Sequence, residues 1–322
     1  MKLRPFSSLK KQSGLTLVEL MVAVVISLIV VLAATAALLM SRQGFVQVDA
    51  ASLLRDNAKF AQTLIQRLAI QSGYRDVVFA ATSRPALAQG MTTERPNVFG
   101  FNSAVRNSND RSEEATGSGA AINGSDILVL RFQSAAKEYG STTADQALID
   151  CLGHAPSATM IDRYERFSSV FHIANSAGEP TLMCTRWPDA DDFGKSDTQP
   201  LISGIENFQV LYGVDGITAN NAVFATADSV IDAYLRADQI SHADAQVSLQ
   251  RWQRVRSIRI GMVVRAAPGT AIGDTNTPMH SFEDVMFSSS NDTGSTYTPP
   301  NDGRLRQIVT FTVHLRNPQG DE

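Results

Sequence analysis

The sequence has little of what catalysis or nucleic-acid binding requires. Its 322 residues include only two cysteines and five scattered histidines. No HExxH zinc motif, GxSxG nucleophile motif or glycine-rich phosphate loop occurs. Lysine and arginine (28) are fewer than aspartate and glutamate (32), so the basic surface of a nucleic-acid-binding protein is absent. We therefore expect no enzyme, no catalytic residue, no cofactor, no metal and no nucleic-acid partner.

Two further absences mark the N-terminal part of the chain. No proline occurs between Pro5 and Pro85, and no charged residue occurs between Glu19 and Arg42. Residues 20–40 are apolar except for one serine and one threonine. A helix of that length spans about 30 Å, the thickness of the hydrocarbon core of a bilayer. The segment therefore predicts a membrane-spanning helix.

The residues in front of the apolar run indicate processing. Gly14 precedes this run, whereas the small residue at the cleavage site of a secretory signal follows the apolar core. Residues 1–14 carry four positive charges and no negative one, and positive flanks stay in the cytoplasm. We expect a cytoplasmic leader at 1–14 that is removed, a transmembrane and assembly helix at 15–42, and an exported domain at 43–322.

This arrangement resembles the N-terminal signal of type IV prepilins. In that family a prepilin peptidase cuts after a glycine, methylates the new amine and leaves a glutamate five residues into the mature chain. Gly14, Leu15 and Glu19 match these positions, although most members carry phenylalanine where Leu15 stands. The resemblance implies that Glu19 acts in assembly by pairing with the free amine of Leu15. An ordinary single-span anchor is the alternative, but an acid at the end of a membrane helix usually has a role.

A helical pattern continues beyond the membrane segment. Apolar residues recur at helical spacing, at Leu53, Phe60, Leu64 and Leu68. Leu54, Ala61 and Ile65 lie beside this stripe. Such a stripe is typical of an amphipathic helix. Gly73 is placed to end it. We expect this helix at 43–73, with its apolar stripe packed on the exported domain.

The rest of the chain consists of predicted strands and loops. Residues 74–125 are rich in small and polar residues and predict a loop-rich connector. Five strands are predicted within 126–322: 126–133, 167–174, 205–212, 255–265 and 305–315. The last two alternate apolar and polar residues, as strands with one buried face do. One long helix followed by such strands predicts an α+β fold, with the helix packed on an antiparallel β-sheet.

Further segments narrow the resemblance to type IV pilus minor pilins of the PilW type. They are NAKFAQTLIQRLAIQSGY (57–74), GSDILVLRF (124–132), DCLG (150–153), GIENFQVLYGVD (204–215), WQRVRSIR (252–259) and LRQIVTFTVHLRN (305–317). The resemblance implies a type IV pilin-like fold and a subunit that primes pilus assembly at the fibre tip. Implied partners are other minor pilins, the major pilin, the inner-membrane assembly machinery, membrane lipid and, in some systems, a large tip adhesin.

The same resemblance implies a location. The precursor would cross the bacterial inner membrane once, with its N-terminus in the cytoplasm and its domain in the periplasm, before it enters the fibre. Two alternatives stay open. One is a pseudopilin of type II secretion, which shares the leader and helix. The other is a membrane-tethered adhesin or binding module, whose loops at 80–120 and 266–302 would hold a ligand.

The two cysteines, Cys151 and Cys184, follow the membrane segment and so lie in the compartment where disulfides persist. Pairing would close a loop of about 34 residues, worth roughly 3.8 kcal/mol by chain entropy. Nearby histidines lack metal-ligand spacing, so we favour a structural disulfide over a free thiol or a metal site. An acidic loop near Asp189–Asp197 has some features of a calcium loop, but Pro200 replaces the expected glutamate. The sequence leaves calcium undecided.

Overall fold

The computed structural model describes residues 14–76, 95–106, 120–156, 166–187, 197–219, 226–282, 292–317 and 319. The chain divides into two compact units, residues 1–49 and residues 50–322. The sequence analysis expects the membrane segment to end at residue 42, whereas the boundary between the two units follows Asp49. The leader lies outside the described residues except for Gly14.

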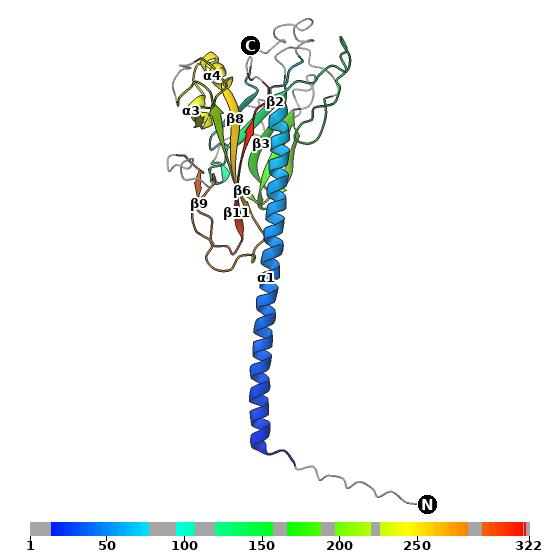
Figure 1. The fold of residues 1–322 in the computed structure, drawn as a ribbon, viewed down its shortest axis with the longest axis vertical. Coiled ribbons are helices and arrows are strands. Elements are labelled where there is room, and N and C mark those ends of the chain that lie inside the picture. The colour runs from blue at the N-terminus through cyan, green and yellow to red at the C-terminus, as the bar shows by residue number, and fades with distance from the viewer. Residues whose placement is uncertain are drawn as a thin grey trace, which may run out of the picture. The chain divides into compact units, whose positions relative to one another are not determined.

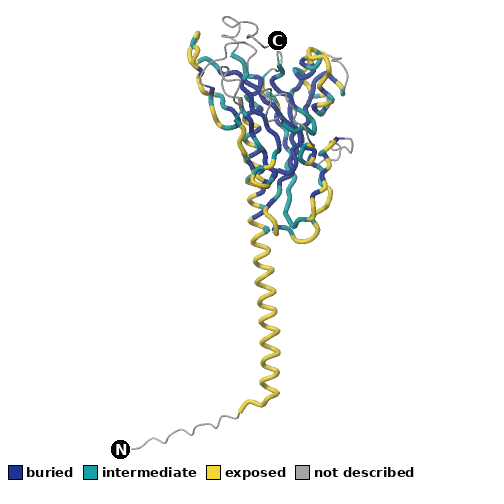
Figure 2. Tube along the Cα trace, turned by 180° about the vertical axis from the view of Figure 1, so that it is seen from behind, coloured by how far each residue is buried: buried dark blue, intermediate teal, exposed yellow. Residues whose placement is uncertain are grey.

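The first unit contains the N-terminal part of helix α1 (Leu17–Gln71). Nearly all of its described residues are exposed, as the yellow tube in Figure 2 shows. Ser27 and Thr35 donate their hydroxyls to carbonyls one turn back, at Ala23 (2.8 Å) and Val31 (3.0 Å). These bonds satisfy both hydroxyls within the helix, as a bilayer requires. Among the described helices, α1 alone is long and apolar enough to span a membrane.

The second unit contains two large antiparallel sheets (Figure 1), with strand orders β1-β2-β3-β4-β5 and β11-β8-β6-β7, and a two-stranded sheet of β10 and β9. The first sheet consists of β1 (Val98–Phe101), β2 (Ile127–Phe132), β3 (Phe167–Ser176), β4 (Glu179–Trp187) and β5 (Asp197–Ser203). The second consists of β6 (Ile205–Val214), β7 (Ala233–Leu235), β8 (Val255–Arg265) and β11 (Arg306–His314). Smaller elements are η1 (Ile122–Gly124), α3 (Ala237–Ile240), α4 (Ala245–Trp252), β9 (Met279–His280) and β10 (Thr296–Tyr297).

The predicted α+β class is confirmed, and all five predicted strands are present as β2, β3, β6, β8 and β11. The strands form two sheets, however, and the chain passes from one to the other at Gly204, between β5 and β6. The Gly204 N–H donates to Pro180 O at 2.8 Å, and its carbonyl accepts from Arg265 N–H at 2.7 Å. Gly204 has φ +85°, and a Cβ there would lie 2.6 Å from Arg265 O. Only glycine fits this junction.

The face of α1 that packs in the second unit is lined by small residues and a few large ones. The buried residues of α1 are Ala50, Leu54, Ala58, Ala61, Ile65, Leu68 and Ala69. The predicted packing of Leu53 and Phe60 was wrong, because these side chains are 57% and 54% exposed. The buried stripe lies beside the predicted one and combines three large side chains with four alanines. Each large side chain buried there stabilises the fold by about 1.5–3 kcal/mol.

The C-terminal end of α1 is fixed by residues from distant parts of the chain. Gly73 has φ +78°, as the sequence predicts for a helix end, and its N–H donates to Arg131 O at 2.8 Å. The side-chain amide of Asn317 donates to the carbonyls of Gln71 (3.4 Å) and Ser72 (3.0 Å). These carbonyls have no partner within the helix. Asn317, which lies far from α1 in the sequence, thus caps the C-terminal end of this helix.

A network of ion pairs holds the two sheets together. It consists of Glu179, Glu206 and Asp302 with Arg265, Arg304 and Arg306. At its centre, Glu206 on β6 lies 2.7 Å from Arg265 and 2.6 Å from Arg306. The side chains of Glu206 and Arg306 are 1% and 3% exposed. Because buried charges are costly when unpaired, these strands are held in one arrangement.

Candidate processing and assembly site

The expected cleavage site lies directly before α1. Gly14 and Leu15 are both exposed, and a Cβ placed on Gly14 would have no neighbouring atom within 4 Å. Nothing in the described part of the chain therefore covers the peptide bond between them. Exposed peptide ahead of a helix is accessible to a peptidase.

Glu19 lies in the first turn of α1 and forms a capping box with Thr16. The backbone N–H of Thr16 donates to Glu19 Oε2 at 2.9 Å, and its hydroxyl donates to the same oxygen at 3.0 Å. In return, the Glu19 N–H donates to Thr16 Oγ1 at 3.3 Å. These bonds satisfy groups that the first turn of a helix leaves open.

Sequence reasoning missed Thr16. Its signal was readable, because a threonine three residues before a glutamate and ahead of an apolar run is a capping-box pattern. Both Thr16 bonds go to Oε2. Glu19 therefore caps its own helix with Oε2 and leaves Oε1 without a hydrogen bond from the described residues.

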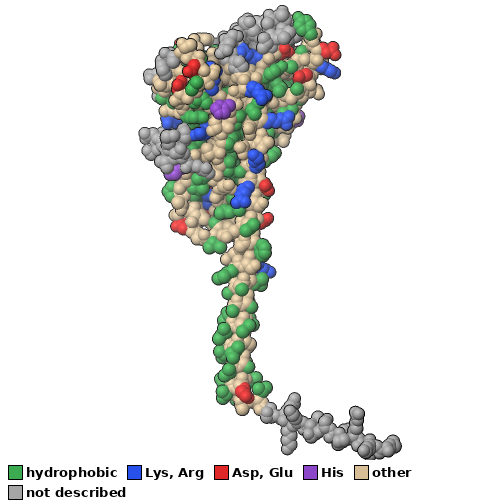
Figure 3. Space-filling model, in the orientation of Figure 1, with side chains coloured by type: hydrophobic (Ala, Val, Ile, Leu, Met, Phe, Trp, Pro, Cys, Tyr) green, Lys and Arg blue, Asp and Glu red, His purple; other side chains and the backbone are tan. Residues whose placement is uncertain are grey.

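The apolar part of α1 exposes large side chains around its whole circumference. They include Leu20, Met21, Val22, Val25, Ile26 and Val30, each more than half exposed. Figure 3 shows these hydrophobic groups along this part of the helix. A surface of this kind is found in lipid or against other apolar helices.

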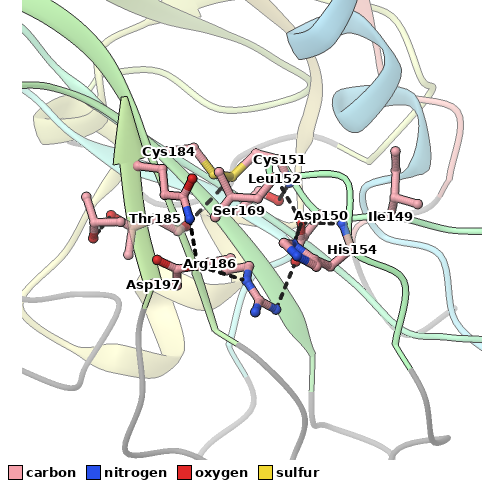
Figure 4. Close-up of a disulfide and its surroundings, with 12 residues drawn as sticks. Ile149, Asp150, Cys151, Leu152, His154, Ser169, Cys184, Thr185, Arg186 and Asp197 are labelled. Carbon is pink, nitrogen blue, oxygen red and sulfur yellow. Dashed lines mark hydrogen bonds and ion pairs between the residues drawn. A yellow bond between two sulfur atoms is a disulfide. The ribbon is translucent and has the colours of Figure 1, made fainter. Parts of the chain in front are cut away.

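The predicted disulfide is confirmed. Cys151 and Cys184 are bonded, with their Cα atoms 6.1 Å apart (Figure 4). Cys184 lies on β4, Cys151 lies in the loop before β3, and both are buried. The Cys151 N–H also donates to the Ser169 hydroxyl at 3.0 Å. The bond therefore fixes this loop against the five-stranded sheet.

Charged groups beside the disulfide hold the same loop (Figure 4). Asp150 accepts hydrogen bonds from the N–H groups of Leu152 (2.8 Å) and His154 (3.0 Å). Arg186 lies 3.4 Å from Asp150 and 3.8 Å from Asp197. Of the acidic loop at 189–197, only Asp197 is among the described residues, and it faces an arginine. The calcium hypothesis otherwise falls on residues outside the described ones.

His172, on β3, is buried and neutral near pH 7. Burial, together with the charge of Arg106, lowers the pKa of His172 to about 4. Its Nε2 lies 3.1 Å from Thr185 Oγ1, which lies 2.8 Å from Thr198 Oγ1. Within the described ranges no three His, Cys, Asp or Glu side chains come close enough to hold a metal. His172 is therefore part of the packing of the sheet.

Two family models match the chain. The model of the type IV pilus-assembly protein W family matches residues 170–317, and that of the prokaryotic N-terminal methylation motif matches residues 9–35. The two matches support a type IV pilus minor pilin of the PilW type. A solved structure of a type IV-like pilin from Thermus thermophilus is similar over 83% of this chain and 98% of its own, with 13% identity and a TM-score of 0.37. No curated protein sequence matches the chain.

The two matches lie in different units of this minor pilin. The methylation motif covers Gly14, Leu15 and Glu19, and so includes every residue of the candidate processing and assembly site. The PilW match begins on β3 and ends at Asn317, which caps α1. Motif and helix together indicate a membrane-anchored pilin. The match to PilW favours a minor pilin over the pseudopilin that the sequence left open.

Proposed function

We propose that this minor pilin primes the assembly of a type IV pilus and sits at the fibre tip with other minor pilins. The observation that carries the proposal is an apolar helix segment, exposed along its length, joined to a separate folded unit. Such a segment can leave the bilayer only if other apolar helices replace the lipid around it. The protein would then act by packing instead of by turnover, in agreement with a sequence that carries no recognised catalytic motif.

Processing and topology follow from the N-terminal residues. We propose that the leader at 1–14 stays in the cytoplasm because of its positive charge and that a prepilin peptidase removes it. Residues 15–42 would hold the chain in the inner membrane, while 43–322 folds in the periplasm. The bond between Cys151 and Cys184 supports this side, since disulfides persist there. Further partners would be the assembly machinery, the major pilin, other minor pilins and, where present, a tip adhesin.

We also propose that Glu19 pairs with the N-terminal amine of Leu15 in this or an adjoining subunit. The open Oε1 supports the pairing, because Thr16 occupies only Oε2. In a medium of low dielectric constant the attraction is strong and an unpaired charge is costly. A subunit displaced along the fibre axis would leave both charges unpaired. The pair would therefore set the axial register of one subunit against the next.

The experiment on priming uses cells that lack this protein and carry a tagged full-length copy. We expect the deletion to reduce the number of fibres per cell several-fold, the tagged copy to restore it, and immunogold label to lie at one fibre end. Label along whole fibres would show a shaft subunit. An unchanged fibre count in the deletion would contradict priming.

Processing is tested in the same cells with two glycine variants. Gly14→Leu should stay membrane-bound with its leader intact and should not restore the fibres. Gly44→Leu is the control, because a Cβ at either glycine has no neighbour within 4 Å, yet only Gly14 adjoins the cleaved bond. The mature N-terminus of the Gly44→Leu protein should be Leu15, and a different N-terminus would contradict the cleavage site.

A further inference from the structure

Three of the four edges of the two large sheets are protected against further pairing. β1 is four residues long and lies against α3. β5 carries Pro200, which lacks an N–H, and its register shifts opposite Leu182 and Met183. β7 is three residues long. Short strands, prolines and bulges are means by which proteins prevent sheet edges from pairing.

The fourth edge, β11, has none of these features. It is nine residues long and pairs with β8 along its whole length, without a register shift and without proline. The Ala266 N–H donates to Leu305 O at 2.8 Å, and the Leu315 N–H donates to Arg256 O at 2.9 Å. Because hydrogen-bonded pairs alternate along an antiparallel ladder, the main-chain N–H and C=O groups of the odd-numbered residues of β11 point toward β8. The main-chain groups that point away from β8 are those of Arg306, Ile308, Thr310, Thr312 and His314.

These outward groups are open. Within the described part of the chain no backbone hydrogen bond reaches them. Ile308, Thr310 and Thr312 are half-buried and His314 is exposed. The Thr310 hydroxyl donates to Ser281 O at 3.2 Å, but this bond leaves the main-chain N–H of Thr310 free. A row of open donors and acceptors at strand spacing is a template for another strand.

We propose that β11 accepts an extended strand from a different subunit of the pilus, which adds a fifth strand to the β11-β8-β6-β7 sheet. The proposal rests on the proposed function, because it takes its partner from the other pilin-type subunits. In this mode of binding, main-chain hydrogen bonds supply the affinity, and alternate side chains supply the specificity.

The residues at the edge define the chemistry of the partner strand. In antiparallel pairing, every second partner side chain would lie beside Val309, Phe311 or Val313, which pack in or against the core. Those positions suit β-branched or aromatic residues. The C-terminal end of β11 presents exposed His314 and Arg316. An aspartate or glutamate at the start of the partner strand would therefore be favoured.

A second copy of this chain is a poor partner for the same edge. Two β11 strands paired antiparallel about Thr310 would place His314 opposite Arg306 and Arg316 opposite Arg304. Self-pairing would therefore bring no carboxylate opposite His314 or Arg316, whereas an opposite charge placed there stabilises a strand pair. The charge pattern thus favours a strand of different sequence.

Residue-resolved hydrogen exchange of the full chain in detergent tests the proposal, alone and in complex with the other minor pilins of its cell. In the chain alone, the amides of Ile308, Thr310 and Thr312 should exchange fast, and those of Val309 and Phe311 slowly. In the complex, the even-numbered amides should slow by about tenfold or more, as hydrogen-bonded strand amides do.

Three outcomes would overturn the proposal. Even-numbered amides that stay fast in a formed complex would show that β11 is not the docking edge, while the proposed function would stand. Slow exchange in the chain alone would show that the edge is covered by this chain or, if concentration-dependent, by a second copy. Failure of the full chain to join any pilin complex would overturn the proposed function, and this inference with it.

A pair of variants tests the edge independently. Thr310→Pro removes the outward N–H but no bond to β8, whereas Thr310→Val keeps that N–H; both lose the hydroxyl bond to Ser281. We expect Thr310→Pro to reduce recovery in the complex by about tenfold and Thr310→Val to match the wild type. Formation of the Cys151–Cys184 bond reports that both variants fold. A folded Thr310→Pro protein that assembles normally would contradict the proposal, and the exchange experiment decides if it does not fold.

Discussion

The two units of this minor pilin reach order in different ways. In the first, the described residues are almost all exposed, and the helix is held by its own backbone bonds and the Thr16–Glu19 capping box. The second has a hydrophobic core, a disulfide and a buried ion network. The first unit therefore needs lipid or other helices to cover its side chains, and the second does not. Substitutions in the first should change assembly, and substitutions in the core of the second should change stability.

The largest loss of stability is expected for a substitution at the centre of the ion network. Glu206→Gln removes the charge that faces Arg265 at 2.7 Å and Arg306 at 2.6 Å. Breaking a buried pair leaves the other charge uncompensated, so we expect the free energy of unfolding to fall by about 3–5 kcal/mol. Urea unfolding of the full chain in detergent, followed by near-UV circular dichroism, measures this loss.

The matched control is Glu179→Gln, because Glu179 also pairs with Arg265, at 2.6 Å, but is 34% exposed. A solvated pair contributes little, so this variant should lose about 1 kcal/mol or less. Equal losses in the two variants would show that burial of Glu206 is not what makes the network important.

The next largest loss of stability is expected for one of two leucine substitutions within α1. Leu68 is 1% exposed, and Leu68→Ala should cost about 3 kcal/mol through lost burial and a cavity. Leu53 is 57% exposed, and Leu53→Ala should change stability by less than about 0.5 kcal/mol. The same unfolding experiment compares them. A large loss for Leu53→Ala would mean that its side chain packs on the fold.

The smallest predicted effect concerns pH. The pKa of His172 is lowered to about 4 by burial and by Arg106, so the unfolded chain binds this proton more readily than the native one. Stability therefore falls as the pH drops from 6.5 toward 4, by about 2 kcal/mol at pH 5. Burial raises the pKa of Asp292 to about 6, with the opposite effect between about 4 and 6.

The variant His172→Gln separates the two groups. Between pH 7 and pH 5, the wild type should lose about 2 kcal/mol relative to this variant, because glutamine does not titrate while Asp292 is unchanged in both. Unfolding curves at the two pH values measure the difference. A constant gap between wild type and variant would show that His172 titrates normally.

How far the sequence predicts this fold depends on the kind of signal. The apolar run before Arg42 and the alternation in β8 and β11 are local patterns, and they predict those elements. β4 and β5 were missed, because Pro180 near the start of β4 and Pro200 within β5 weaken their strand patterns. Residues such as Asn317 were missed for another reason: their partners lie far away in sequence, and no local pattern predicts such a contact.

The same distinction applies to the candidate site. Gly14, Leu15 and Glu19 form a short motif that can be read directly, and the disulfide follows from there being only two cysteines. Leu53 and Phe60 were placed on the buried side of α1 because large apolar residues outweighed alanines in the pattern. The alanines are buried together with Leu54, Ile65 and Leu68, since close packing selects for size as well as for hydrophobicity.

The most direct test of the account is incorporation of Glu19→Gln into fibres or into the minor pilin complex. Glutamine can serve in a capping box as glutamate does, so this variant keeps the helix end and removes only the charge. With the leader cleaved and the disulfide formed as in the wild type, we expect incorporation to fall as far as in Glu19→Ala. Normal incorporation of Glu19→Gln would show that Glu19 serves only as a cap for its own helix, and would contradict charge pairing as the device that sets subunit register.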